Sequence, residues 1–290
     1  MAPASLRALL SGLIDYAGLF PPAALPLADV ARNYGTYRQS DERWALGRLV
    51  VPATRLDELL ALARSSSDRW RVTALVGDDL AGDARRIAAV GESPTISVES
   101  AEVRCATVDQ IRAAVDALGS VPEVYVELPL TDTLSTLIAA VRDAGARAKI
   151  RTGGIVADGI PSAADCARFL VLCASRKVAF KATAGLHHPL RGRYPLTYAP
   201  DAPHGELFGF VNVFVAAAFA ARGVKEHELE QVLVEADVRS FDFSATGISW
   251  RNQSLSLDDL RATRASLAIA FGSCSFREPM DELTQFGLLS

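Results

Sequence analysis

From about residue 47 onward, short apolar runs alternate along the chain with longer stretches in which apolar residues recur every three or four positions. The short runs predict buried strands, and the periodic stretches predict helices with one apolar face. Thr54 is placed to cap the first of these helices, and the last helix is predicted over residues 255–273. Strands are predicted at residues 47–53, 70–77, 95–105, 123–130, 147–155, 177–186 and 240–250, and a short strand that merges into an apolar helix is predicted within residues 206–223.

This alternation predicts an α/β fold with parallel strands and right-handed crossovers. The economical arrangement of eight such units is a closed (β/α)8 barrel of the TIM type, and the alternative is an open, doubly wound parallel sheet. We expect a single domain over residues 1–290, with residues 1–45 as an N-terminal extension. No G-x-G-x-x-G follows the first strand and no G-x-x-x-x-G-K-[ST] occurs, so nucleotide binding is disfavoured and no cofactor is expected.

The composition limits the partners of the protein. Apolar residues make up 50% of the chain, and the net charge is −4 with scattered Lys and Arg, which disfavours a nucleic-acid binder. No apolar run approaches the length of a membrane span, and no signal-peptide pattern is present. The four cysteines form no C-x-x-C pair, as is typical of free thiols in a reducing compartment.

We therefore expect a cytoplasmic protein that binds a small anionic molecule, with no nucleic-acid or membrane partner. The apolar segment 210–223 packs either against the barrel or against a second subunit, so a homo-oligomer is one of the possibilities.

Lys181 lies inside an apolar run, and two histidines follow just beyond the end of that run. Side chains alternate along a strand, so Phe180 belongs to one face while Lys181, Thr183 and Gly185 belong to the other. The apolar face must contact the helices. Lys181 is therefore expected to point into the barrel lumen, where an unpaired ammonium is unfavourable.

The two preceding strands show the same arrangement. Lys149 and Arg151 share one face of their strand, and Tyr125 and Glu127 share one face of the strand before it. Three strands thus direct charge into one volume, with an excess of positive charge that Glu99 could balance. One hypothesis is a structural ion-pair cluster of Glu127 with Lys149 or Arg151. The hypothesis that we favour is a site for an anionic substrate.

This environment predicts chemistry for Lys181. Desolvation and neighbouring cations both disfavour an ammonium, so the pKa of Lys181 is expected to be depressed. A neutral amine is a nucleophile that forms a Schiff base with a carbonyl group. In this interpretation Lys149 tunes pKa values, Glu127 or a rim histidine moves protons, and Arg151 binds a carboxylate or phosphate through its planar fork.

The segment "AFKATAGL" resembles the Lys-Thr-Ser-Thr-Gly signature on strand six of deoxyribose-phosphate aldolase and related class I aldolases, and "AKIRTGGI" is similar to strand five of that family, offset by one residue. The resemblance implies a lyase in which Lys181 forms the imine, Gly185 is the turn glycine and Lys149 matches the strand-five lysine. The family's second lysine, on strand seven, has no counterpart in "LFGFVNVF", and its glycine-rich phosphate loops are not evident in "SATGISW". Lys149 or Arg151 would therefore have to lower the pKa of the imine-forming lysine.

His187 and His188 follow the strand end, where a barrel carries its active site, and they can transfer protons near neutral pH. We expect His188 to be catalytic. The expected substrate contacts are Arg151, Thr183, Gly185, His187 and Arg191. Adjacent histidines on an extended segment point opposite ways, so no metal is expected. One alternative is a metal-assisted hydrolase or isomerase that uses His187, His188, His204 and carboxylates, and another is a non-catalytic barrel that binds an anionic metabolite.

Two segments outside the regular pattern carry further candidates. Residues 13–22 hold Asp15 and Tyr16 in an apolar, turn-rich context, and we expect them to cap the bottom of the barrel, with a lid over its mouth as the alternative. Residues 271–279 place Cys274 between aromatic residues. A catalytic cysteine needs an activating group such as histidine nearby, so a packed turn is expected there.

Overall fold

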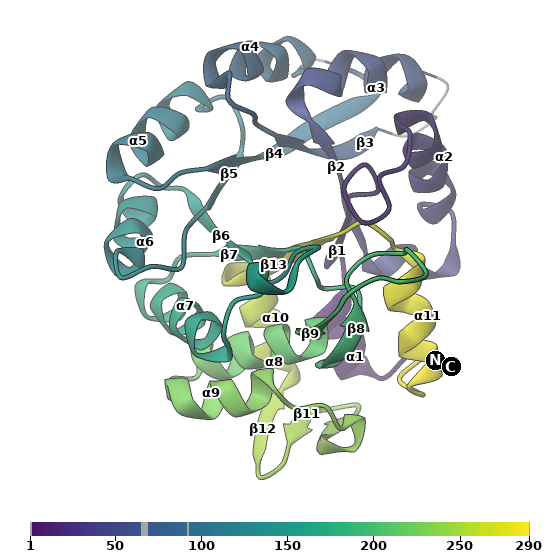
Figure 1. The fold of residues 1–290 in the computed structure, drawn as a ribbon, viewed down its shortest axis with the longest axis vertical. Helices are drawn as coiled ribbons and strands as arrows, with labels where there is room; N and C mark the ends of the chain where they lie inside the picture. Colours follow the sequence, from purple (N-terminus) through teal and green to yellow (C-terminus); the bar gives the residue numbers. More distant parts are fainter. Residues whose placement is uncertain (1, 65–68, 92, 290) are drawn as a thin grey trace.

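A closed ring of eight parallel strands forms the centre of the computed structural model, which describes residues 2–64, 69–91 and 93–289 (Figure 1). This ring confirms the predicted (β/α)8 barrel and excludes the open sheet. In order around the barrel, the strands are β1 (Ile14–Tyr16), β13 (Ala268–Ser273), β7 (Phe180–Thr183), β6 (Arg147–Arg151), β5 (Glu123–Glu127), β4 (Ile96–Arg104), β3 (Trp70–Leu75) and β2 (Leu46–Pro52).

Helices surround the strands on the outside of the ring (Figure 1). They are α1 (Ala4–Leu10), α2 (Leu27–Tyr37), α3 (Leu56–Ala63), α4 (Leu80–Val90), α5 (Val108–Ala117), α6 (Leu134–Asp143), α7 (Ala163–Arg176), α8 (Phe210–Ala221), α9 (Glu226–Leu233), α10 (Leu257–Ser266) and α11 (Arg277–Gln285). Ser256 caps α10 with a capping box. Thr54 does not cap α3, because it lies in a short 3-10 turn that precedes the helix.

The predictions for the seventh and eighth strands are wrong. Where the seventh strand was predicted, β9 (His204–Leu207) pairs antiparallel with β8 (Gly192–Pro195) in a hairpin that is separate from the barrel sheet. Where the eighth strand was predicted, β10 (Phe241–Phe243) and β11 (Gly247–Trp250) join β12 (Gln253–Ser256) in a three-stranded antiparallel sheet. Figure 1 shows β11 and β12 projecting away from the ring.

The barrel takes its two remaining strands from β1 and β13. β1 lies within residues 1–45, the range expected as an extension, and it closes the ring by pairing with β13 and β2. β13 follows α10 after a single residue, Leu267, so no turn signal separates helix from strand in the range 255–273. Because β1 comes first, Lys149 and Lys181 lie on the sixth and seventh barrel strands rather than the fifth and sixth.

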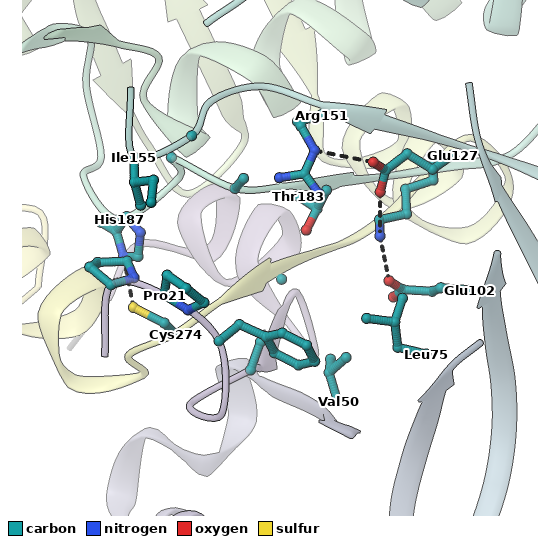
Figure 2. A pocket seen from close by; sticks show the side chains of 18 of the residues that line it. Pro21, Val50, Leu75, Glu102, Glu127, Arg151, Ile155, Thr183, His187 and Cys274 are labelled. Carbon is teal, nitrogen blue, oxygen red and sulfur yellow. Dashed lines mark hydrogen bonds and ion pairs between the residues drawn. The ribbon is translucent and has the colours of Figure 1, made fainter. Parts of the chain in front are cut away.

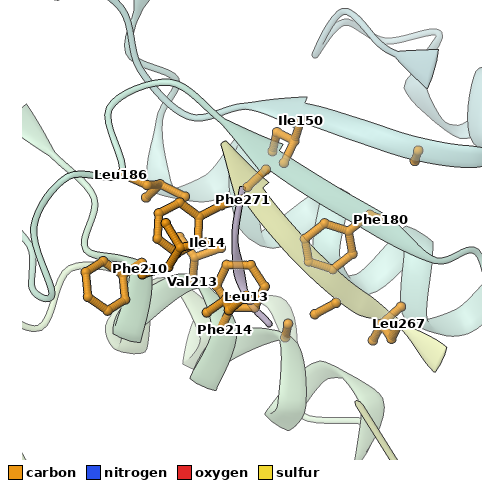
Figure 3. Packing of buried hydrophobic residues seen from close by; sticks show 14 of the residues in the cluster. Leu13, Ile14, Ile150, Phe180, Leu186, Phe210, Val213, Phe214, Leu267 and Phe271 are labelled. Carbon is orange, nitrogen blue, oxygen red and sulfur yellow. The ribbon is translucent and has the colours of Figure 1, made fainter. Parts of the chain in front are cut away.

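An apolar core joins α8 to one side of the barrel (Figure 3). Every residue of α8 from Phe210 to Ala220 is buried, so its sequence shows no polar face. The ring centroids of Phe210 and Phe214 lie 5.2 and 5.9 Å from that of Phe271 on β13. The segment 210–223 therefore packs against the barrel of its own chain. Within the described ranges, no helix has both the length and the apolar character that a membrane crossing requires.

Candidate active site

A cavity of about 570 Å³ lies at the carboxyl ends of the barrel strands, where a (β/α)8 barrel carries its active site (Figure 2). Strand residues Glu102, Glu127, Lys149 and Thr183 line part of it. Other parts come from the loop after β1, the β8–β9 hairpin and the first turn of α11. The loop of residues 17–22 thus lies at the mouth, so the expectation that this segment caps the bottom of the barrel is wrong.

Five charged strand residues form a continuous chain of ion pairs, which we call the lumen network: Asp15, Glu102, Glu127, Lys149 and Lys181. Lys181 Nζ lies 2.5 Å from Asp15 Oδ2, and it also lies 2.5 Å from Glu102 Oε1, as an ion pair without hydrogen-bond geometry. Lys149 Nζ lies 2.7 Å from Glu102 Oε2 and 2.8 Å from Glu127 Oε2. Each of the five is at most 9% exposed. The structure therefore contains the ion-pair cluster of the first hypothesis.

A bulge in β4 brings Glu102 into the lumen network. β3 and β4 pair in step as far as Val98, but the register then skips Glu99, and Ser100 pairs with Thr73. A skipped residue reverses the alternation of faces beyond it. In a regular strand Glu102 would lie on the same face as Val98. Because Glu99 is skipped, Glu102 lies with Ser100 on the opposite face, the lumen face.

Glu99 does not supply the missing negative charge, because it belongs to a second layer of ion pairs. Its carboxylate pairs with Arg48 at 2.9 Å and with Arg71 at 3.0 Å. Arg48 also pairs with Glu123 at 2.8 Å, and its backbone N–H donates to Asp15 Oδ1 at 2.6 Å. The second layer thus holds one oxygen of Asp15 while Lys181 holds the other.

The expectation of a depressed pKa for Lys181 is wrong. Burial by itself lowers the pKa of this ammonium, but the carboxylates of Asp15 and Glu102 outweigh burial and raise the pKa above its usual range. The direction of the pKa shift at Lys181 is decided by these two carboxylates and not by the neighbouring cation Lys149. Lys181 also does not line the cavity, whereas Lys149 does.

Two arginines extend from the lumen network toward solvent. The Nε groups of Arg104 and Arg151 donate to Glu127 Oε1 at 3.0 and 3.1 Å, and Figure 2 shows the contact of Arg151. Their side chains are 74% and 41% exposed, and both residues line the cavity. Because each guanidinium contacts Glu127 through Nε, its terminal N–H groups are available to a ligand. Two such N–H groups bind a carboxylate or phosphate well.

A second polar group, which we call the rim cluster, contains His187, Tyr198, Cys274 and Glu278. His187 Nδ1 lies 3.3 Å from Glu278 Oε2 and 3.8 Å from Cys274 Sγ. The Tyr198 hydroxyl donates to Glu278 Oε2 over 2.9 Å and lies 3.6 Å from Cys274 Sγ. All four residues line the cavity, and Figure 2 shows His187 and Cys274 together on the side away from Glu127.

The rim cluster holds a charged histidine. Burial opposes the charge on His187, but the contacts with Cys274 and Glu278 outweigh it and raise the pKa of the imidazole to about 10. His187 is therefore an imidazolium at neutral pH, and its Nδ1 lies beside Cys274 Sγ. Cys274 is buried directly after β13, as a packed turn requires, but the histidine at its sulfur was not expected from the sequence.

A tight turn after β7 positions His187. Ala184 and Gly185 both have positive φ, 64° and 75°, so the chain turns sharply just before the histidine pair. A Cβ atom at Gly185 would lie 3.0 Å from the Cα of Gly153 in the loop after β6. The glycines of "RTGGI" and "TAGL" are thus required where two loops approach each other closely.

His188 belongs to a neighbouring hydrogen-bonded group. Its Nδ1 lies 2.7 Å from Glu282 Oε1, and its ring stacks on Tyr194 with centroids 3.5 Å apart. In the described part of the chain, His188, Glu278 and Glu282 each place a potential metal-ligating atom within 4.8 Å of the other two, but each of them already has a protein partner. His204 is exposed on β9 and does not line the cavity, so the predicted set of three histidines does not converge.

The cavity brings together most of the site residues predicted from the sequence. Those that line it are Glu127, Lys149, Arg151, Thr183, Gly185, His187 and His188. Lys181 and Arg191 do not. The Arg191 guanidinium instead lies over the ring of Phe208, 4.6 Å from its centroid.

Several functional residues escaped the sequence-based prediction. Glu102 and Arg104 alternate at the end of a predicted strand, and that spacing was a usable signal. Cys274 and Glu278 gave no such signal, because they follow a barrel strand that was hidden in a predicted helix. Only the closure of the barrel brings them beside His187.

Comparisons with known proteins do not place the chain in a family. No protein-family model matches it, and no curated protein sequence matches it either.

Proposed function

We propose that this protein is an enzyme of the lyase class that acts on a small anionic carbonyl or hydroxy compound bound in the mouth cavity. One observation carries the proposal: a single cavity is lined both by the partly exposed guanidiniums of Arg104 and Arg151 and by the proton-transferring side chains of the rim cluster. A concave site with a few convergent polar groups is the usual form of a small-molecule site.

The charge balance of the cavity floor supports an anionic ligand. Four cations, Lys149, Lys181, Arg104 and Arg151, face three carboxylates, Asp15, Glu102 and Glu127. One positive charge therefore remains among these seven side chains, next to the two arginines that reach the cavity, while the carboxylate of Asp78 lines another part of the cavity. A surplus of one sign in a concave site attracts ligands of the opposite sign.

The rim cluster supplies groups for bond cleavage next to a carbonyl. Such a reaction needs a proton donor for the carbonyl oxygen and an acceptor for a proton of the neighbouring group. The imidazolium of His187 is a donor at neutral pH, and the sulfur of Cys274 is an acceptor when the thiol has lost its proton. These roles are compatible with the lyase class that the aldolase resemblance implies.

An imine on Lys181, the route implied by the resemblance, meets two obstacles. The amine would have to lose its proton while Asp15 and Glu102 stabilise the charged form, and the residue does not line the cavity. Borohydride reduction in the presence of glyoxylate, followed by peptide mass spectrometry, tests this route. We expect no added mass on Lys181, and a stoichiometric adduct there would restore the imine mechanism.

Ligand binding tests the anion site itself. Glyoxylate, an anionic aldehyde, is expected to raise the melting temperature in a concentration-dependent way, whereas glycolaldehyde, a neutral aldehyde, is not. Arg151→Gln should shift the response to glyoxylate concentrations about 10-fold higher or more. Arg142→Gln is the matched control, because Arg142 is exposed on α6 and pairs with Asp143. An equal response to both aldehydes, or a response that Arg151→Gln leaves unchanged, would overturn the proposal.

A further inference from the structure

We propose that Cys274 is the nucleophile of the cavity and that it forms a reversible covalent adduct with the carbonyl carbon of the bound anion, with His187 as the proton donor. The substrate class, an anionic aldehyde or ketone, rests on the proposed function. The reactivity of the thiol rests on different residues, those of the rim cluster.

Cys274 lies beside two polar groups, at a place that a ligand can reach. Its Sγ lies 3.8 Å from His187 Nδ1 and 3.6 Å from the Tyr198 hydroxyl, and each of these groups has one proton that it can donate either to the sulfur or to Glu278 Oε2. Glu278 contacts the same two donors and holds them in place. Cys274 is only 5% exposed, but it lines the cavity, so the molecules that reach the sulfur are those that enter the cavity.

The arrangement differs from a Cys-His-carboxylate relay. In such a relay the nucleophile and the orienting carboxylate contact opposite nitrogens of the imidazole ring. Here Cys274 and Glu278 both contact Nδ1 of His187. His187 therefore acts as a charged donor that stabilises the thiolate and then gives up its proton, and Glu278 keeps the ring charged.

The other three cysteines provide an internal comparison. Cys166 and Cys173 are buried in α7, and burial raises the pKa of Cys166 to about 12. Cys105 lines a smaller hollow beside Arg104, and burial raises its pKa to about 11. All four cysteines lie in the described ranges, and Cys274 is the one with a histidine at its sulfur.

The proposed step is an addition without a change of oxidation state. The Cys274 thiolate forms a C–S bond to the carbonyl carbon while the C=O π bond breaks, and the oxygen takes the Nδ1 proton of His187. The products are a hemithioacetal, or a hemithioketal from a ketone, and a neutral imidazole. The reverse reaction returns the proton to His187 and releases the carbonyl compound, so no oxidant or further reactant is needed.

Alkylation of the full-length protein by iodoacetamide, followed by peptide mass spectrometry, tests the thiol. At pH 7 Cys274 is expected to react at least about 10-fold faster than Cys105, because the thiolate is the reactive form. His187→Asn should bring the rate down to that of Cys105. His204→Asn, which changes an exposed histidine away from the cavity, should leave it unchanged. Equal rates at Cys274 and Cys105 in the wild-type protein would overturn the proposal.

His187→Asn removes a buried charge, so a loss of reactivity in this variant could come from a folding defect. A second variant therefore tests the same site without removing a charge. Tyr198 is 57% exposed, so Tyr198→Phe removes the hydroxyl beside Sγ with little effect on packing. This variant is expected to slow alkylation of Cys274 a few-fold while the circular dichroism spectrum stays the same. An unchanged or increased rate would contradict the donor role of the hydroxyl.

Protection by an aldehyde tests the adduct. Glyoxylate should slow alkylation of Cys274 more than glycolaldehyde does, and Arg151→Gln should remove the difference. If glyoxylate raises the melting temperature without protecting Cys274, the anion site stands and the adduct is overturned. If Cys274 reacts fast but glyoxylate neither binds nor protects, the proposed function and the adduct both fail, and the reactive thiol alone remains.

Discussion

The lumen network, of which Glu102, Glu127 and Lys149 line the cavity, and the rim cluster use their polar groups in opposite ways. In the lumen network, each carboxylate oxygen has a cation or a backbone N–H within 3.1 Å, and all five residues lie on barrel strands. In the rim cluster, the contacts of the sulfur are 3.6 and 3.8 Å long, and its members come from loops, a hairpin and a helix. The lumen network is thus saturated, whereas the rim cluster keeps bonding capacity for a ligand.

This difference shows that a lysine in an apolar strand does not by itself mark the reactive group. A buried charge requires partners, and at Lys181 the barrel supplies two carboxylates, which stabilise the ammonium form. Candidate reactive groups are better identified as those whose hydrogen bonding is incomplete and which face the cavity. The predictions below test whether the two groups differ in this way.

The largest expected effect is that of Lys181→Met on stability. The variant leaves Asp15 and Glu102 facing each other without their shared cation, and breaking a buried pair costs about 5 kcal/mol at the upper end of measured values. Urea denaturation gives the change in the free energy of unfolding. Lys225→Met, at an exposed lysine, is the control and should stay within about 0.5 kcal/mol. A loss below about 1 kcal/mol at Lys181 would mean that the lumen network is not a structural unit.

The rim cluster should lose stability in alkali. Folding raises the pKa of His187 from 6.5 to about 10, so its stabilisation is fully present below pH 6.5 and is lost as the pH rises through 10. The shift corresponds to about 5 kcal/mol. The measurement is the difference in unfolding free energy between the wild-type protein and His187→Asn from pH 6 to 10.5. A difference that stays constant over this range would show that the imidazole is not charged by its neighbours.

The lumen network should lose stability in acid instead. Burial opposes the charge on Glu102, but Lys149 and Lys181 outweigh it and lower its pKa from 4.5 to about 2. Its stabilisation is therefore present above pH 4.5 and is lost as the pH falls through 2, with a total of about 3 kcal/mol. Comparison of wild type with Glu102→Gln between pH 5 and 2 measures this contribution. If the two proteins lose stability in parallel, Glu102 does not carry the charge assigned to it.

The smallest expected effect separates the two arginines at the boundary of the network. Arg104 is more exposed than Arg151, 74% against 41%, so solvent screens its charge more strongly. Arg104→Gln is expected to weaken glyoxylate binding only a few-fold, whereas Arg151→Gln should weaken it by about 10-fold or more. A titration of the melting temperature against glyoxylate concentration gives both values. A larger loss at Arg104 would move the anion site to the outer side of Glu127.

The alternation of strands and helices was sufficient to predict the barrel and six of its strands, because each has a periodic apolar pattern. The same alternation predicted that Lys149 and Lys181 face the lumen. It could not reveal β1, which has three residues, or β13, which continues the apolar pattern of α10. Both are defined by pairing partners that are distant in the sequence.

The prediction of the site failed where it depended on those distant contacts. The pKa of Lys181 is set by Asp15, 166 residues earlier in the chain, and by Glu102, whose direction depends on a bulge. Cys274 is 87 residues from His187. Local spacing carries no information about such pairs, so the sequence identified individual charged residues without the partners that determine their chemistry.

The order in which the chain is made gives the pairing of β1 with β13 a further consequence. β1 is translated first of the barrel strands and β13 last, and the ring closes where they meet. A nascent chain that still lacks β13 already contains His187 but has no sulfur beside it. The rim cluster is therefore complete only after β13 and α11 have been made and β13 has paired with β7, so a growing polypeptide that lacks them does not contain it.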